Sequence, residues 1–158
     1  MIIKTKIIDK SIQMQPLQYA KYGDAGIDLV ATSKTYDEHG NVVYGTNRAF
    51  EIPKGYVGLL FPRSSNSRHD LILSNSVGVL DSGYRGEVMF KYKPSYKFDT
   101  YPGNIYDYDG IEFTGDLHEV GERIGQLIIM PYPTVEFVES EDLSDTQRGD
   151  GGYGSTGK

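Results

Sequence analysis

The chain has 158 residues, a formal net charge of −6, three histidines and no cysteine. This length suits one domain with its own core, and the lack of cysteine excludes disulfides, thiolate metal sites and a cysteine nucleophile. The acidic balance argues against a general nucleic-acid-binding protein, although a few placed cations could still hold a single nucleotide.

No apolar run approaches the roughly 18 residues that a membrane span needs. The N-terminal stretch MIIKTKIIDK is too short and too charged for a signal peptide. We therefore expect a soluble protein of the cytoplasm, or of the host cytoplasm if a phage encodes it, with no membrane contact.

Apolar residues come in short bursts of strand length, separated by glycine, proline, asparagine and aspartate. The bursts are rich in β-branched and aromatic residues, and no long stretch shows the three-and-four spacing of an amphipathic helix. The sequence therefore predicts an all-β domain, a sandwich or a barrel. The expected strands lie in IIKTKII, GIDLVA, AFEIP, GYVGLLF, DLILS, EVMFKY, RIGQLIIM and TVEFVE.

Three connections between these bursts have recognisable patterns. Residues 32–47 contain an H-G-N turn between strand-like pieces and are expected to form a hairpin or a long loop. The stretch SSNSRHD predicts one short helical turn, with Ser64 or Ser65 as its N-cap. Residues 74–88, SNSVGVLDSGYRGEV, are expected to form a strand, a D-S-G turn and a second strand.

Two regions look like additions to this core. Residues 93–118 mix tyrosines with acids around P-G-N and D-G turn signals, which favours an extra surface hairpin over a partner-binding patch. Residues 139–158 are polar and glycine-rich, and we expect a flexible arm that becomes ordered when something binds. The β-domain would then span residues 1–138.

Two polar groups are suited to binding an anion. Arg63, Ser64 and Ser65 follow a strand at the start of the expected helical turn, and a guanidinium with hydroxyl donors suits phosphate oxygens. Arg123 and Gln126 at the start of a later strand offer further donors. The alternatives are an ordinary serine cap and a solvated strand edge.

Three other side chains have both a functional and a structural explanation. Asp28 lies between apolar residues, where either a magnesium water shell or a buried hydrogen bond would account for a carboxylate. Asp81 and Tyr84 flank the D-S-G turn. Aspartate and glycine are common turn residues, and a turn tyrosine commonly packs on a neighbour, so these two alone indicate no chemistry.

The C-terminal GYGSTGK fits the core of a P-loop, the glycine-rich cradle whose backbone N–H groups hold nucleotide phosphates. A P-loop is preceded by a strand and opens a helix, and no residues follow to form that helix. The same region contains the tripeptide RGD at residues 148–150, which is common by chance.

Taken in order, the stretches AGIDLVA, PRSS, NSVGVLDSGYRGE, GERIGQL and RGDGGYGSTG resemble the five motifs of the trimeric dUTP pyrophosphatases, the dUTPases. The resemblance spans residues 25–157. It implies a jelly-roll-like β-clip fold and a homotrimer whose active sites are shared between subunits. The implied activity is Mg²⁺-dependent hydrolysis of dUTP to dUMP and pyrophosphate, which limits uracil in DNA and supplies dUMP for dTMP synthesis.

The resemblance also implies roles for individual residues. Asp81 matches the aspartate that activates the attacking water, and Tyr84 the tyrosine that packs on the deoxyribose and rejects UTP. Asn75 and Val79 belong to the implied uracil pocket, and Asp28 reaches the metal through a water. The remaining implied substrate contacts, mostly to phosphate, are Arg63, Ser64, Ser65, Arg123, Gln126, Arg148, Gly152, Tyr153, Gly154, Ser155 and Thr156.

The sequence departs from the family pattern at several positions. Tyr153 stands where phenylalanine is usual, and Glu122 and Gly125 stand where aspartate and alanine are common. Residues 93–118 are longer than the usual connection. Some phage members carry similar inserts, and a few use them to bind regulatory proteins, which makes a protein partner here a hypothesis.

Three other functions are weighed against this one. A dCTP deaminase shares the fold and the motif order, but no residue here matches its catalytic glutamate. An adhesive protein displaying RGD lacks any sign of secretion. A regulatory protein that keeps the site only as a nucleotide-gated switch is disfavoured, because all the catalytic positions of the family have matching residues.

Overall fold

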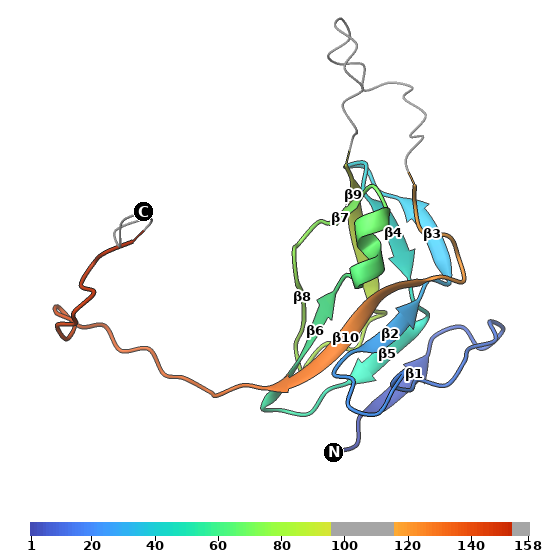
Figure 1. Ribbon diagram of the computed structural model, residues 1–158. Coiled ribbons are helices and arrows are strands. Elements are labelled where there is room, and N and C mark those ends of the chain that lie inside the picture. The colour runs from blue at the N-terminus through green and yellow to red at the C-terminus, as the bar shows by residue number, and fades with distance from the viewer. Residues whose placement is uncertain (96–115, 153–158) are drawn as a thin grey trace, which may run out of the picture.

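Ten strands and one short 3-10 turn make up the regular structure of the described residues, 1–95 and 116–152, in the computed structural model (Figure 1). The all-β prediction is confirmed. The elements are β1 (Lys4–Ile7), β2 (Ile27–Val30), β3 (Ser33–Tyr36), β4 (Val42–Gly45), β5 (Arg48–Glu51), β6 (Tyr56–Phe61), η1 (Ser64–Arg68), β7 (Leu71–Leu73), β8 (Gly78–Leu80), β9 (Met89–Pro94) and β10 (Arg123–Pro131).

The strands form two four-stranded sheets and one two-stranded sheet, and every pair is antiparallel. One sheet has the order β2-β10-β6-β8, the second has the order β3-β4-β9-β7, and β1 pairs with β5. Strands far apart in the sequence are therefore neighbours, as in a jelly roll. In Figure 1, β10 crosses the front of the domain between β2 and β6.

The core lies between the two larger sheets and draws apolar residues from both. Along β9, buried and exposed residues alternate strictly, the two-residue period expected of a strand that covers a core with one face. Phe90 and Tyr92 point inward from this strand, with ring centroids 6.2 Å apart. Tyr44 of β4 meets the Tyr92 ring edge-on at 6.0 Å.

Both buried tyrosine hydroxyls have partners, so the core contains these polar atoms at little cost. Tyr44 Oη donates to the carbonyl oxygen of His118 at 2.9 Å, and Tyr92 Oη donates to that of Ile124 at 2.6 Å. Burial raises the pKa of both phenols well above the ordinary value, which keeps the hydroxyls neutral donors.

Gly125 of β10 lies against the ring of Phe90. A Cβ atom at this position would overlap the ring carbons, so the missing side chain of β10 makes room for the large one of β9. The departure from alanine at position 125 is thus matched by the size of its neighbour in the core.

The predicted hairpin of residues 32–47 is confirmed as β3 and β4, and Asp37 organises its turn. The Asp37 carboxylate accepts hydrogen bonds from the backbone N–H groups of His39 and Asn41 and from the Asn41 side-chain amide. Lys91 of β9 adds an ion pair at 3.1 Å. These bonds, led by that of the Asn41 side chain, hold the pKa of Asp37 well below its ordinary value of 3.8.

Three local predictions were wrong. The residue at the N-cap of η1 is Arg63, not Ser64 or Ser65, and it makes no side-chain cap bond, because its guanidinium reaches Asp28 instead. The second strand expected within residues 74–88 is absent, because residues 84–88 form no strand and the next strand, β9, begins at Met89 and pairs into the other sheet. TVEFVE is not a strand, because no described segment lies beside it to share a ladder.

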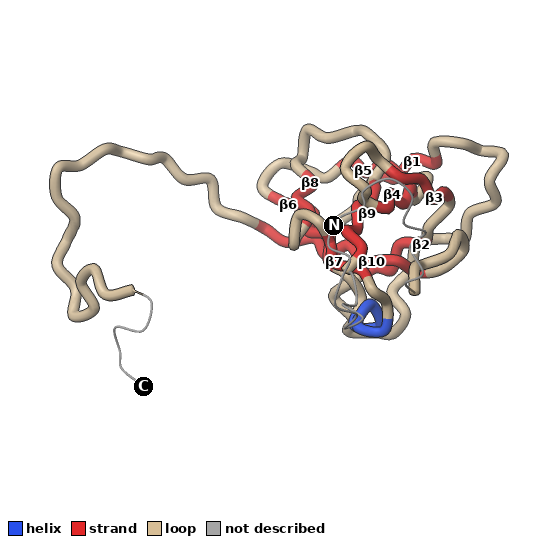
Figure 2. Tube along the Cα trace, turned by 90° about the horizontal axis from the view of Figure 1, so that it is seen from above, coloured by secondary structure: helices blue, strands red, loops and turns tan. Residues whose placement is uncertain are grey.

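After β10 the chain leaves the body of the domain. Residues 133–152 run away from the sheets as an extended segment, which is visible in two perpendicular views (Figures 1 and 2). Within the described residues the hydrogen bonds of this segment are local, as between Ser140 Oγ and the carbonyl oxygen of Asp142. Within the described residues, no helix is long and apolar enough to cross a membrane.

Gly125→Ala is expected to destabilise the chain by about 1–3 kcal/mol, because the added methyl group must displace the Phe90 ring in a packed core. Urea unfolding of Gly125→Ala, Phe90→Leu and the double variant measures this coupling. The double variant should lose less than the sum of the two single losses. Additive losses would contradict the proposed contact.

Asp37→Asn should lower the melting temperature at neutral pH, and the difference from the unaltered chain should shrink in acid. The lowered pKa means that the folded chain resists protonation of Asp37. The stabilisation from the ionised carboxylate is therefore complete above pH 3.8, the ordinary pKa, and is lost as the pH falls further toward the pKa of the folded chain. Thermal melts at neutral pH and at about pH 3 test this. Glu38→Gln, in the same turn and 86% exposed, is the control. A pH-independent difference would refute the assignment.

Candidate active site

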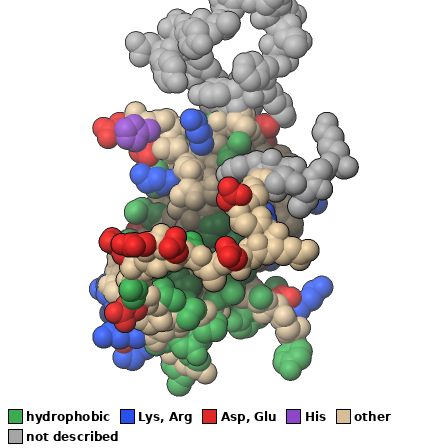
Figure 3. Space-filling view, turned by 90° about the vertical axis from the view of Figure 1, so that its left-hand side faces the viewer, with side chains coloured by type: hydrophobic (Ala, Val, Ile, Leu, Met, Phe, Trp, Pro, Cys, Tyr) green, Lys and Arg blue, Asp and Glu red, His purple; other side chains and the backbone are tan. Residues whose placement is uncertain are grey.

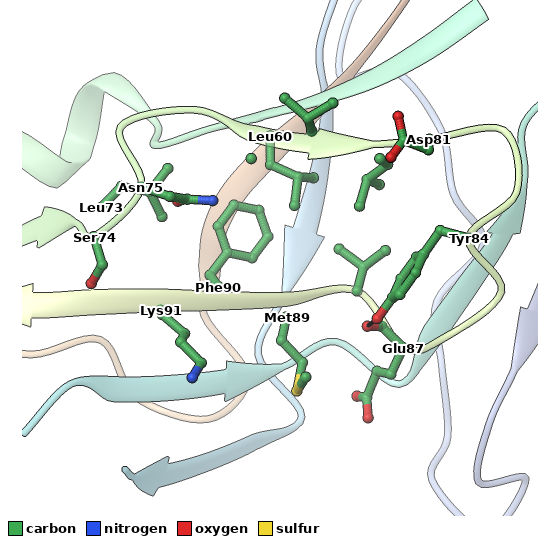
Figure 4. A pocket seen from close by; sticks show the side chains of 14 residues that line it. Leu60, Leu73, Ser74, Asn75, Asp81, Tyr84, Glu87, Met89, Phe90 and Lys91 are labelled. Atoms are coloured by element: carbon green, nitrogen blue, oxygen red, sulfur yellow. Dashed lines mark hydrogen bonds between the residues drawn. The ribbon is translucent and has the colours of Figure 1, made fainter. Parts of the chain in front are cut away.

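A cavity of about 390 Å³ lies between β8 of one sheet and β9 of the other (Figure 4). The D-S-G turn carries the chain from β8 toward β9, so two consecutive strands become facing walls. Gly78 lets β8 lie close to β6, since a Cβ there would be 2.9 Å from Leu60 Cβ. The apolar lining consists of Leu60, Leu73, Val79, Leu80, Val88, Met89 and Phe90.

Four of the sequence-predicted site residues line this cavity: Asn75, Val79, Asp81 and Tyr84. In Figure 4, Asn75 lies at one end of the cavity, and Asp81 and Tyr84 lie at the other. Strand β8 therefore carries a carboxamide before it and a carboxylate after it, with a short apolar stretch between them.

The loop before β8 holds Asn75 in a tight turn. Ser76 has a positive φ of 60°, a conformation that residues other than glycine seldom adopt. Its N–H donates to the carbonyl oxygen of Leu73 at 3.0 Å. Ser74 fixes the loop from the other sheet, because its hydroxyl donates to Asn41 Oδ1 at 2.8 Å and its N–H to the carbonyl oxygen of Lys91 at 2.9 Å.

Tyr84 is positioned by the residues that follow it. Its hydroxyl donates to the carbonyl oxygen of Glu87 at 2.9 Å, and its ring covers Gly86, where a Cβ would be 2.7 Å from Tyr84 Cζ. The Tyr84 N–H closes the turn by donating to the carbonyl oxygen of Asp81 at 3.0 Å. The ring is therefore held at the rim of the cavity, 44% exposed.

Asp81 presents a carboxylate at the same rim. Within the described part of the chain this side chain makes no hydrogen bond or ion pair, so its oxygens are available to a water molecule or a ligand. A carboxylate held beside a cavity can accept a proton from a bound water, which is the chemistry of a general base.

A second polar cluster forms where β2, β10 and β6 run side by side. The strand register places Gln126 beside both Asp28 and Phe61. Asp28 accepts hydrogen bonds from Arg63 Nε at 2.8 Å and from Arg123 Nη1 at 3.2 Å. The sequence-predicted residues Asp28, Arg63, Ser65, Arg123 and Gln126 thus lie in one region.

This cluster carries one more positive charge than negative charge, and its arginines are oriented by Asp28. Arg63 is bound on both sides, because its Nη1 also donates to Ser65 Oγ at 3.0 Å. Gln126 Nε2 donates to the carbonyl oxygen of Pro62 at 3.2 Å, and Gly26 leaves space for that side chain. A preorganised guanidinium with a hydroxyl and an amide beside it can bind phosphate oxygens.

The Asp28 carboxylate was predicted to contact a magnesium ion through a water molecule. Each oxygen of Asp28 accepts one arginine N–H, which leaves a further lone pair for a water. Mg²⁺ usually keeps several waters and takes few protein ligands beside substrate phosphates, so this environment fits an outer-shell contact.

The structure does not bring every predicted residue together. Arg63, Ser64, Ser65, Arg123 and Gln126 are not among the residues that line the cavity. Arg148 and Gly152 lie on the extended segment, where Arg148 Nε donates to the carbonyl oxygen of Gly151 at 2.9 Å. Tyr153, Gly154, Ser155 and Thr156 lie outside the described residues.

The extended segment is acidic as well as remote. Residues 133–152 contain six acidic side chains and one basic one. Figure 3, viewed from the side toward which this segment projects, shows a row of acidic side chains with hydrophobic side chains beneath the row. Its apolar residues Val135, Phe137 and Leu143 are all exposed.

Sequence reasoning missed several residues that support the site. Glu87 anchors Tyr84 through its backbone and accepts a hydrogen bond from the Asn47 N–H through its side chain at 2.7 Å. Asn41 supports the Asn75 loop from another hairpin. The only sequence signal was the proximity of Glu87 to the D-S-G turn, since contacts between distant segments leave no local pattern.

Comparisons with known proteins agree with these features. The model of the dUTPase family matches residues 12–98 and 117–157. The deoxyuridine 5'-triphosphate nucleotidohydrolase of Corynebacterium glutamicum is 38% identical over 99% of this chain and 95% of its own length. That of Finegoldia magna is 35% identical over 98% of this chain and 99% of its own.

Solved structures of phage enzymes have the same fold. The dUTPase of Staphylococcus bacteriophage 80alpha with dUPNHPP has a TM-score of 0.79 and 29% identity over 99% of both chains. A mutant dUTPase of phage phi11 of S. aureus, described with a structural Mg(II) ion, has a TM-score of 0.69 and 25% identity over 89% of this chain and 97% of its own. By fold, motifs and relatives, this chain belongs to the dUTPase family.

Proposed function

We propose that this chain hydrolyses dUTP to dUMP and pyrophosphate, and so limits uracil incorporation into DNA while supplying dUMP for dTMP synthesis. The observation that carries the proposal is the cavity between β8 and β9, which is lined by Asn75, Asp81 and Tyr84 in a chain of the dUTPase family.

The end of the cavity that contains Asn75 suits the uracil base. Asn75 and the backbone beside β8 supply donors and acceptors within a tight turn. Cytosine would present a donor where uracil presents an acceptor and would leave buried groups unpaired, a large penalty. The methyl group of thymine would meet backbone that the turn at Ser76 holds in place.

At the sugar and the α-phosphate, Tyr84 and Asp81 act together. The anchored Tyr84 ring packs on the deoxyribose and leaves no room for a 2′-hydroxyl. Asp81 holds a water and takes its proton while the water oxygen bonds to the α-phosphorus. The bond from the α-phosphorus to the bridging oxygen breaks, and pyrophosphate leaves.

Binding of the triphosphate requires the polar cluster around Asp28 and the arm of residues 139–158. Arg63, Ser64, Ser65 and Gln126 would bind phosphate oxygens. Asp28, which orients Arg63, would hold a water of the magnesium ion. Bound to the triphosphate, Mg²⁺ supplies positive charge that neutralises the developing negative charge. Arg148 and the glycine-rich residues of the arm close over the nucleotide.

The cavity, the second polar cluster and the extended segment lie apart within one chain. This separation supports a homotrimer in which other copies of the chain complete each active site. The domain would span residues 1–138 and the arm residues 139–158. The family match is interrupted between residues 98 and 117, close to the insert of residues 93–118, where a protein partner remains a proposal. A variant that lacks residues 96–115 tests this proposal. If it still forms a trimer and hydrolyses dUTP, the segment is dispensable for catalysis.

Asp81→Asn should abolish pyrophosphate release from dUTP while dUTP still binds, because the amide cannot accept the proton of water. Pyrophosphate and ammonia are measured with dUTP, UTP, dTTP and dCTP in the presence of Mg²⁺. Only dUTP should react, without ammonia. Full activity in the variant would contradict the base role, and ammonia from dCTP would indicate a deaminase.

Gly86→Ala should reduce the preference for dUTP over UTP by about tenfold, or about 1.4 kcal/mol, because the new methyl group pushes Tyr84 from the sugar site. The ratio of kcat/KM for the two substrates reports the change. Gly83→Ala in the neighbouring D-S-G turn is the matched control, since a Cβ at Gly83 meets no atom within 4 Å. An unchanged ratio in Gly86→Ala would contradict the anchoring of Tyr84.

A further inference from the structure

A cluster of potential metal ligands lies outside the substrate cavity, where η1 meets the segment that leads into β10. His69, His118 and Glu122 each offer one ligand atom, and these three atoms lie within 4.8 Å of one another. None of the three lines the cavity between β8 and β9. The function proposed above uses none of them.

His118 is held with one ring nitrogen facing a carboxylate. Its side chain is 2% exposed, and its Nε2 lies 3.1 Å from Asn66 Oδ1. The Asn66 amide is oriented by its own bond, because Nδ2 donates to the carbonyl oxygen of Leu71 at 2.8 Å. Asn66 Oδ1 is then an acceptor, so the Nε2 of His118 carries the proton.

The other nitrogen of this ring therefore has a lone pair. His118 Nδ1 lies 3.5 Å from Glu122 Oε2, so two acceptors face each other across a short gap. A cation between them would remove the repulsion. A histidine whose second N–H donates to a fixed oxygen is also the usual arrangement of a metal ligand, because that bond sets the tautomer and the ring orientation.

His69 adds a second nitrogen in the same place. Its ring lies beside that of His118, with centroids 3.9 Å apart. Its Nδ1 is buried and has no hydrogen-bond partner among the described residues, although Asp116 Oδ1 is 3.5 Å away. A buried polar atom without a partner is costly, and a bound ion would satisfy it.

We propose that His69, His118 and Glu122 bind a Zn²⁺ ion, with a water molecule in the fourth position. Two imidazoles, one carboxylate and a water form a ligand set that Zn²⁺ takes in tetrahedral sites, whereas Mg²⁺ prefers oxygen ligands only. With Zn–ligand distances of about 2.0–2.1 Å, neighbouring ligand atoms lie roughly 3.3 Å apart. The distance of 3.5 Å between His118 Nδ1 and Glu122 Oε2 is close to that separation.

The ion would join two parts of the chain that are distant in sequence. Asn66 belongs to η1, next to the phosphate-binding Ser65, and it bonds to the proposed ligand His118. Glu122 is fixed in turn, because its Oε2 accepts a hydrogen bond from the Glu119 N–H at 2.9 Å. A Zn²⁺ ion here would therefore tie the C-terminal end of η1 to residues 118–122, separate from the magnesium of the substrate.

Calorimetric titration of the tag-free, metal-stripped full chain with Zn²⁺ tests the proposal. One ion should bind per chain and raise the melting temperature, and Mg²⁺ in excess should not displace it. Co²⁺ in place of Zn²⁺ should give the visible absorption of a tetrahedral site. His69→Gln and Glu122→Gln should each weaken Zn²⁺ binding at least tenfold.

His39→Gln is the matched control, since this third histidine is 76% exposed on the β3–β4 turn, and its Zn²⁺ affinity should not change. Glu122→Gln keeps an oxygen for the Glu119 N–H, and the melt of each metal-free variant shows that it folds. The proposal is overturned if the unaltered chain binds no Zn²⁺ in a saturable way. It is also overturned if both ligand variants bind as tightly as the unaltered chain, or if Mg²⁺ displaces Zn²⁺ readily.

Discussion

The assignment of β8 and β9 to opposite sheets is the constraint on which the candidate active site depends. A hairpin would have brought the two strands together through backbone hydrogen bonds and closed the space between them. Here β8 pairs with β6 and β9 pairs with β4 and β7, so the D-S-G turn bridges two layers and the side chains between them border a cavity. Asp81 and Tyr84 stand at the rim because the turn that carries them makes this crossing.

Much of the fold could be predicted from the sequence because local patterns of residues determine the individual strands and turns. The short apolar stretch EVMFKY predicted β9, and the H-G-N turn predicted the β3–β4 hairpin. The segment TVEFVE has the composition of a strand and is not one, since a strand also needs a neighbour for its backbone groups. The pairing of the strands could not be predicted, because it depends on contacts across the whole chain.

The candidate site was predicted through family motifs rather than through geometry. The motifs named Asp28, Arg63 and Arg123 separately, but their ion pairs depend on the β2–β10–β6 register. Asp28 therefore acts first as the partner that orients two guanidinium groups. A lone aspartate in an apolar stretch cannot reveal such partners, since they lie 35 and 95 positions away in the chain.

The contact between Gly125 and Phe90 restricts how this chain can evolve. A relative with alanine at position 125 cannot carry the Phe90 ring in its present place, so the two positions are expected to change as a pair. The order of the changes also matters, because a smaller residue at position 90 leaves space, whereas a methyl group added first at position 125 meets a filled core. Lineages should therefore pass through a chain with a smaller side chain at position 90 before alanine replaces Gly125.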